Sequence, residues 1–76
     1  MSPQLQFYEF VRITAQPPRL RETVVGREGI VVGMSDPHPN GKRDYGVWVF
    51  EHKQVFALPG DGLTTLGRIG TRADVV

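Results

Sequence analysis

A chain of 76 residues has room for one domain with one small hydrophobic core. Nine Lys and Arg residues against eight Asp and Glu give a net charge of +1, which argues against a domain that binds nucleic acid mainly through its phosphates. The absence of cysteine excludes disulfides and zinc–thiolate sites, and a hydrophobic content of 39% is that of an ordinary globular protein.

The N-terminal part predicts a flexible lead-in over residues 1–6 and a first strand over residues 7–13, FYEFVRI. Side chains alternate between the two faces of a strand, so Val11 and Ile13 share one face, which we expect to be the core side. Phe10 then lies on the other face. There it either covers a second, shallower cluster or adds to the surface.

A long loop and a second strand follow. Residues 14–27 contain two consecutive prolines, which cannot donate to a strand ladder, and their apolar positions lack helical spacing. Residues 28–35, EGIVVGMS, predict a strand with Ile30, Val32 and Met34 on one face. Two glycines in this strand indicate strong twist, a bulge or a close approach of another backbone: Gly29 and Gly33.

The third strand, YGVWVF over residues 45–50, is the most concentrated run of strand-forming residues. It is apolar on both faces, which predicts a central strand that is covered on both sides. We place Val47 and Val49 in the core. Trp48, the only tryptophan, and Phe50 must then lie on the other side of the sheet.

The remaining elements are short and are separated by turn residues. In chain order we expect a hairpin loop over residues 36–44, a tight turn at 51–53, a fourth strand over 54–58, a single 3-10 turn over 59–63, a final strand over 64–69 and a flexible C-terminus over 70–76.

Five short strands in this order predict an all-β fold, a small five-stranded SH3-like barrel with a single 3-10 turn, over residues 7–69. An OB-like barrel is the alternative, but it usually has a helix between its third and fourth strands, and the turn EHK leaves no room for one. The expected core consists of Val11, Ile13, Ile30, Val32, Val47, Val49, Leu58, Leu63 and Leu66.

The residue types that carry catalysis or bind metals are scattered. A nucleophile needs a base held beside it, and no hydroxyl here lies in a nucleophile-elbow sequence. His38 lies close to Asp36 and Asp44 in the chain, and His52 is next to Glu51, but without Cys or an i, i+4 histidine pair this spacing carries no metal signal. We expect solvated loop histidines, no enzymatic activity, no metal and no cofactor.

Two kinds of binding are compatible with the pattern. GREGIVVG, residues 26–33, resembles the loop and strand of a KOW motif, and Arg27, Lys42 and Arg43 could follow a nucleic-acid backbone while aromatic side chains stack on bases. Protein binding is favoured because Trp48 and Phe50 face away from the core of a domain too small for a second layer. Phe10, Tyr8 or Phe56 could extend this aromatic patch, unless the long first loop folds over it.

Several segments carry a family resemblance: FYEFVRI at 7–13, GREGIVVG at 26–33, YGVWV at 45–49, and VFALP at 55–59 with Leu63 and Gly67. Together they resemble the immunity protein 31 family, small bacterial proteins assigned to polymorphic toxin systems. Similar glycine-spaced strands occur in the SH3-like parts of nitrile hydratase β subunits and in KOW proteins. The resemblance implies a protein that binds a cognate toxin domain and blocks it in the producing cell.

Such a function needs a rigid surface with a few buried hot-spot residues and matched charges. The partner-binding positions that we predict on physical grounds are Trp48, Phe50, Tyr45, Asp36, Lys42, Arg43 and Asp44. Inhibitors of nucleases are often strongly acidic and this chain is not, so either the toxin is not a nuclease or blocking does not use charge mimicry. A KOW-like nucleic-acid-binding domain is the alternative function.

No segment approaches the roughly 18 apolar residues of a membrane span, and the N-terminal residues lack a basic and then apolar signal pattern. We therefore expect a soluble, cytoplasmic protein that does not contact a membrane. The sequence leaves its oligomeric state open.

Overall fold

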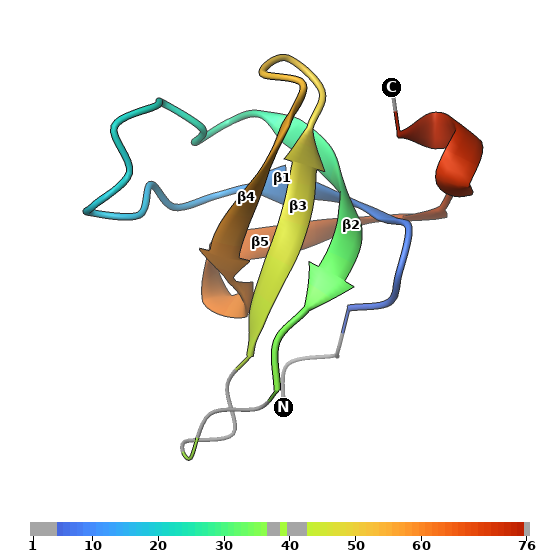
Figure 1. The fold of residues 1–76 in the computed structure, drawn as a ribbon, viewed down its shortest axis with the longest axis horizontal. Coiled ribbons are helices and arrows are strands. Elements are labelled where there is room, and N and C mark those ends of the chain that lie inside the picture. The colour runs from blue at the N-terminus through green and yellow to red at the C-terminus, as the bar shows by residue number, and fades with distance from the viewer. Residues whose placement is uncertain (1–4, 37–38, 40–42, 76) are drawn as a thin grey trace.

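Five antiparallel strands form one sheet. The computed structural model describes residues 5–36, 39 and 43–75. Its elements, in chain order, are β1 (Glu9–Ile13), β2 (Glu28–Met34), β3 (Asp44–Val49), β4 (Gln54–Pro59), the 3-10 turn η1 (Gly60–Gly62), β5 (Leu63–Ile69) and the 3-10 turn η2 (Arg72–Asp74). The strand order in the sheet is β4-β3-β2-β1-β5 (Figure 1). The all-β prediction is confirmed.

Two turns predicted from the sequence are also confirmed. The β3–β4 turn is tight, and the N–H of Lys53 donates to the carbonyl oxygen of Val49 at 2.8 Å. η1 is a single 3-10 turn that ends where the N–H of Leu63 donates to the carbonyl oxygen of Gly60. β1 begins later than the predicted residue 7, because Tyr8 has a φ of 64° and lies in a turn instead of an extended strand.

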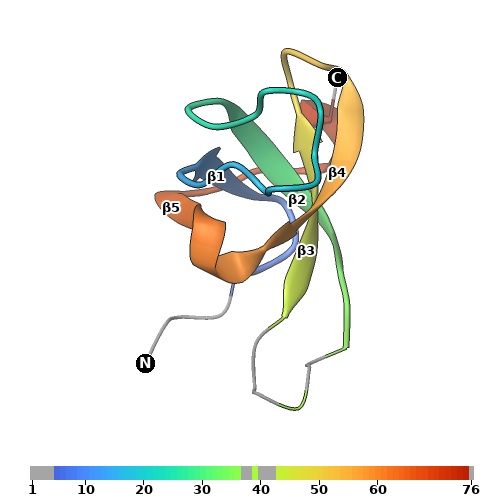
Figure 2. The same ribbon diagram turned by 90° about the vertical axis from the view of Figure 1, so that its left-hand side faces the viewer.

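The strands form two layers that meet along β2. β2, β3 and β4 lie side by side in front in Figure 1, and β1 with β5 crosses behind them; Figure 2 shows the same crossing from the side. β1 pairs with β2 on one side and with β5 on the other. β4 and β5 are the two ends of the hydrogen-bonded order among the described residues, so closure into an SH3-like barrel stays a prediction.

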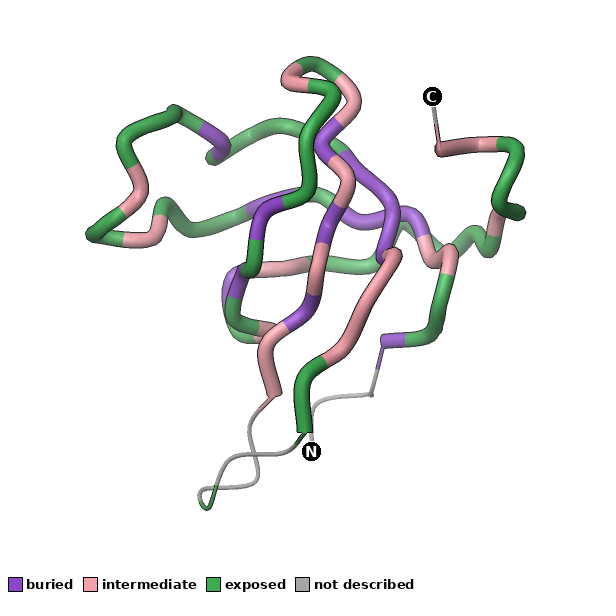
Figure 3. Tube along the Cα trace, viewed as in Figure 1, coloured by how far each residue is buried: buried purple, intermediate pink, exposed green. Residues whose placement is uncertain are grey.

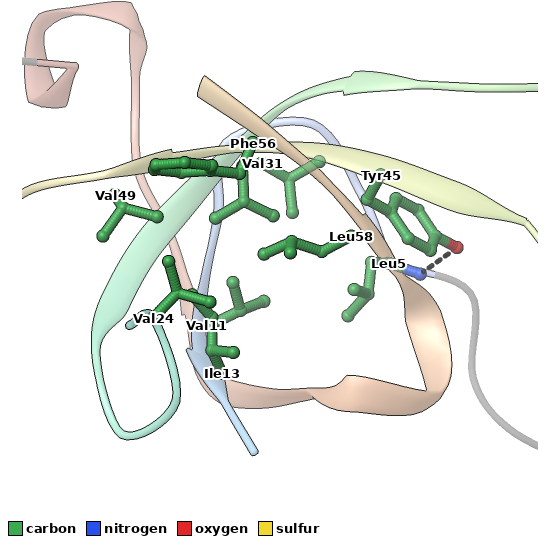
Figure 4. Close-up of a cluster of buried hydrophobic side chains, with 10 residues drawn as sticks. Leu5, Val11, Ile13, Val24, Val31, Tyr45, Val49, Phe56 and Leu58 are labelled. Carbon is green, nitrogen blue, oxygen red and sulfur yellow. Dashed lines mark hydrogen bonds between the residues drawn. The ribbon is translucent and has the colours of Figure 1, made fainter. Parts of the chain in front are cut away.

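The main core lies between the two layers, and we call it the inner core. It consists of Leu5, Val11, Ile13, Val24, Val31, Tyr45, Val47, Val49, Phe56 and Leu58, with Leu20, Met34 and Leu63 packed against it. Figure 3 shows buried and half-buried residues alternating along β3, and Figure 4 shows side chains from both layers converging. The core assignments of Val11, Ile13, Val47, Val49 and Leu58 are confirmed.

The register of β2 against β3, together with a bulge, makes part of the core prediction wrong. Val31 pairs with Val47 but Gly33 pairs with the next residue of β3, Gly46, so two residues of β2 face one of β3. Val31 points into the inner core because its partner Val47 does, and this pair lies before the bulge, whereas Val32 is only half-buried. Ile30 is fully buried but lies on the opposite face of the sheet. A bulge, one of the three features that the two glycines indicated, is present, and it breaks the simple alternation so that Met34 as well as Val31 packs on the inner core.

A second irregularity removes Leu66 from the core. Between Glu9 and Val11 two residues of β1 face four residues of β5, and Gly67 within this segment has a φ of 77°. Leu66 is consequently 40% exposed, and Ile69 is exposed as well. The prediction that Leu66 belongs to the core is wrong.

The chain ends also differ from the predicted irregular segments. Leu5 is buried in the inner core although it belongs to the expected flexible lead-in. At the other end, η2 is closed by a capping box in which the N–H of Thr71 donates to Oδ2 of Asp74 at 2.8 Å. The flexibility of the termini stays a prediction. No helix in the described part of the chain is long and apolar enough to cross a membrane.

Candidate protein-binding surface

The face of the sheet opposite the inner core carries a row of apolar side chains, and we call it the outer face. Cross-strand partners point to the same side of a sheet. Phe10 of β1 pairs with Ile30 of β2, Ile30 with Trp48 of β3, and Trp48 with Val55 of β4. These four side chains therefore form a continuous row across four strands, and Phe50 follows Trp48 on the same side.

The outer face is a thin second hydrophobic layer that is partly open to solvent. Ile30 is completely buried and Phe10 is 7% exposed, whereas Trp48 and Phe50 are half-buried and Val55 is 48% exposed. The rings of Phe10 and Phe50 lie 6.0 Å apart between centroids, at an interplanar angle of 35°. Phe10 and Ile30 thus form the buried part of this layer, and the aromatic rings of Trp48 and Phe50 reach its surface.

The C-terminal segment covers the Phe10 end of the row. The guanidinium carbon of Arg68 lies 4.0 Å from the centre of the Phe10 ring, a cation–π contact. A Cβ atom at Gly70 would meet the same ring and the carboxylate of Asp74, so only glycine fits at that position. The sequence gives no direct sign of this cover, because Arg68 reaches Phe10 from the irregular part of β5.

The long first loop packs on the inner core instead. The side chain of Gln16 organises it, because its Oε1 accepts hydrogen bonds from the N–H groups of Val24 and Val25 at 2.9 and 3.2 Å. Its Nε2 donates to the carbonyl oxygens of Glu22 and Leu20 at 2.8 and 3.3 Å. Val24 is completely buried in the inner core. Through Val24 the loop is therefore anchored on the inner core, and not over Trp48 and Phe50 as the alternative expected.

Two ion pairs lie beside the aromatic side chains. Arg12 and Glu28 are cross-strand partners joined at 2.7 Å, and Arg27 contacts Glu51 at 2.8 Å. All four side chains are about half exposed, so each pair contributes under about 1 kcal/mol to folding. The guanidinium groups of both arginines therefore already have anionic partners. Arg27 is one of the basic residues that could follow a nucleic-acid backbone in the KOW-like alternative.

The predicted binding residues do not form one patch. Trp48 and Phe50 lie on the outer face, as the alternation predicts, but Tyr45 is 6% exposed in the inner core. Its hydroxyl accepts a hydrogen bond from the N–H of Leu5 at 3.3 Å (Figure 4). Tyr45 is therefore a core residue whose position excludes it from a shared surface with Trp48.

The predicted charged positions lie at the far end of the β2–β3 hairpin. Asp36 is exposed, while Arg43 and Asp44 are half-buried. The backbones of Ser35 and Asp44 are linked, because the N–H of Ser35 donates to the carbonyl oxygen of Asp44 at 2.9 Å. At about 3.3 Å per residue, Asp44 is roughly 20 Å from Phe50 along β3. Lys42 lies outside the described residues, as does His38.

The remaining aromatic candidates fall into different places. Phe10 joins the outer face, whereas Phe56 is buried in the inner core and Tyr8 lies in the turn before β1. His52 is also not a solvated loop histidine. Its ring packs edge-on against Phe56, 5.5 Å between centroids, and its Nδ1 is buried without a hydrogen-bond partner in the described part of the chain.

A shallow groove lies beside the last residue of β2, Met34, at the loop end of the β2–β3 hairpin. It has a volume of about 540 Å³ and is lined by Leu5, Gln6, Phe7 and Met34. Arg43 approaches this groove through its Nη1, which lies 3.8 Å from Sδ of Met34. In the described ranges no three or more His, Asp or Glu side chains are grouped as metal ligands.

Comparisons of the chain with protein-family models, curated proteins and solved structures find no match. The similarity to the immunity protein 31 family therefore stays a prediction. The binding surface has to be argued from the geometry of the outer face.

Proposed function

We propose that this chain is a non-enzymatic protein-binding module and that its partner docks on the outer face around Trp48 and Phe50. The observation that carries the proposal is the graded burial of this face. Ile30 and Phe10 are buried underneath, and two large aromatic rings are left half-buried above them. Rigid aromatic side chains that lose their remaining exposure on binding are typical interface hot spots.

The surroundings of the two rings suit a protein partner better than a phosphate backbone. Arg12 and Arg27 are paired with Glu28 and Glu51, so they do not add a free positive stripe beside the aromatic rings. Half-exposed charges around an apolar centre resemble the polar rim of a protein interface. On the family resemblance, the partner is a toxin domain that the protein neutralises in the cytoplasm of the bacterium that produces it.

The decisive experiment uses the C-terminal domain of the protein encoded immediately upstream as the binding partner. Calorimetric titration with wild-type protein and with Trp48→Ala should show a loss of about 2 kcal/mol or more in binding, which is roughly 30-fold in Kd. Urea unfolding of the same variant should show a smaller loss of stability, because Trp48 is only half-buried. Phe7→Ala is the matched control, an aromatic deletion at a 52% exposed position off this face, and should leave binding unchanged.

Two results would overturn the proposal. One is a Trp48→Ala variant that stays folded and binds the partner as tightly as the wild type. The other is binding of RNA or single-stranded DNA that is tight at low salt and weakens steeply as salt rises, which would favour the KOW-like alternative. Should Trp48→Ala fail to fold, Phe50→Ala tests the same surface from the end of the row.

A further inference from the structure

The two edges of the sheet are built differently. β4 is one edge, and its ladder with β3 runs without a register shift from Asp44↔Pro59 to Val49↔Gln54. β5, the other edge, is interrupted by its irregular segment around Gly67. Bulges, charges and prolines are the usual features that prevent an edge strand from pairing with another chain. β4, with the sequence QVFALP, has no charge and has proline only at its last position.

The hydrogen-bond phase shows which backbone groups of β4 point outward. The register continues to Arg43 and Gly60, and the N–H of Gly60 donates to the carbonyl oxygen of Arg43 at 3.1 Å. Hydrogen-bonded pairs alternate along an antiparallel ladder. Counting back from Gly60, every second residue of β4 therefore also has its N–H and C=O groups pointing to β3. The N–H and C=O groups of Val55 and Ala57 therefore point away from β3, toward the open edge.

The side chains of the same two residues lie at the surface. Val55 and Ala57 are both exposed, and Val55 is 48% exposed although it is a large apolar residue on a regular strand. No other strand of the described chain pairs with the outer side of β4. The edge thus offers two adjacent sets of backbone donors and acceptors next to apolar side chains.

We propose that β4 pairs in antiparallel fashion with β4 of a second copy of this chain, about a twofold axis through Phe56. In this register Val55 of each copy faces Ala57 of the other, and both are residues whose backbone groups point outward. Each of the two symmetry-related pairs can form two N–H···O bonds, which satisfies these groups completely. The arrangement joins the two sheets into one continuous sheet.

A second copy is favoured over an unrelated strand by the chemistry of β4. Near a twofold axis, each residue lies close to its own copy in the other chain. A charged residue there would therefore be repelled by the like charge of its symmetry mate. β4 is uncharged, and Val55 opposite Ala57 combines a larger with a smaller side chain. The pairing extends the outer-face row beyond Val55 and leaves Phe50 open for the partner proposed above, so the two proposals are independent.

The test is sedimentation of the purified protein from low micromolar to millimolar concentration. The mass of the wild type should rise from that of one chain, 8.5 kDa, toward that of two. Ala57→Pro removes one outward N–H without removing a bond to β3, and Val55→Lys places a charge beside the axis. Both variants should lose the dimer. Leu66→Lys, the matched change on the other edge strand, should keep it, because Leu66 is comparably exposed.

Amide hydrogen exchange gives a second measurement that does not depend on variants. The N–H groups of Val55 and Ala57 should exchange fast in dilute protein and become protected at high concentration, while the N–H of Leu58, bonded toward β3, should be protected throughout. A wild type that stays monomeric at millimolar concentration would sink the proposal. So would a dimer that persists in folded Ala57→Pro and Val55→Lys, or one that only Leu66→Lys abolishes, which would place the contact on β5.

Discussion

The substitution Gly29→Ala tests how closely β2 and β3 approach each other. A Cβ atom at Gly29 would overlap the carbonyl oxygen of Trp48 and would lie 2.7 Å from Cγ1 of Val47. Neither atom is the end of a flexible side chain, because one belongs to the backbone of β3 and the other to a fully buried valine. The two strands would have to move apart to accommodate a single methyl group.

The expected cost follows from these contacts. Overpacking of a core costs about 1–3 kcal/mol, and the smaller entropy of the unfolded alanine chain offsets only about 0.4–1 kcal/mol of it. We expect a net loss of about 1–2 kcal/mol, against a total stability of roughly 4–11 kcal/mol for a domain of this length. For a domain of this size that loss lowers Tm by about 4–16 °C.

Gly33→Ala is the matched control, because it makes the same change in the same strand. A Cβ at Gly33 would meet no atom within 4 Å, and Gly33 does not have the positive φ of Gly26 or Gly67. Gly33→Ala should therefore be neutral or raise stability by up to about 1 kcal/mol. Thermal and urea unfolding followed by circular dichroism measure both variants. Equal stability of the two variants, or a Gly29→Ala protein as stable as the wild type, would refute the packing that the structure shows.

Two further predictions concern the inner core. Leu58→Ala, at a fully buried position, should cost about 2–5 kcal/mol in urea unfolding, whereas Leu66→Ala should change stability by less than about 0.5 kcal/mol; similar costs would contradict the outward position of Leu66. Tyr45→Phe keeps the ring but removes the hydroxyl that accepts the Leu5 N–H bond, so it should cost about 0.5–1.5 kcal/mol and speed hydrogen exchange at the Leu5 amide, and an unchanged exchange rate would show that this bond does not hold the N-terminal segment.

The amino-acid pattern was sufficient for features that depend on neighbours along the chain. The alternation in YGVWVF separated Val47 and Val49 from Trp48 and Phe50, and the structure places the two pairs on opposite faces. The tight β3–β4 turn and the 3-10 turn η1 depend on short runs of turn residues, so they too could be predicted. The position of Trp48 and Phe50 on the candidate surface also follows from the alternation of residues along one strand.

Only the tertiary structure decided which faces are covered and where strands lose their alternation. The register of β2 against Val47 and Val49 put Val31, not Val32, into the core, and the irregular segment of β5 left Leu66 in solvent while it carried Arg68 onto Phe10. Bulges arise from the pairing of residues far apart in the chain, so a periodic pattern in one strand contains no information on them. Tyr45 lies on the same face of β3 as Val47 and Val49, so its place in the core follows from the alternation, whereas only the tertiary structure shows that Leu5, from the N-terminal segment, bonds to its hydroxyl.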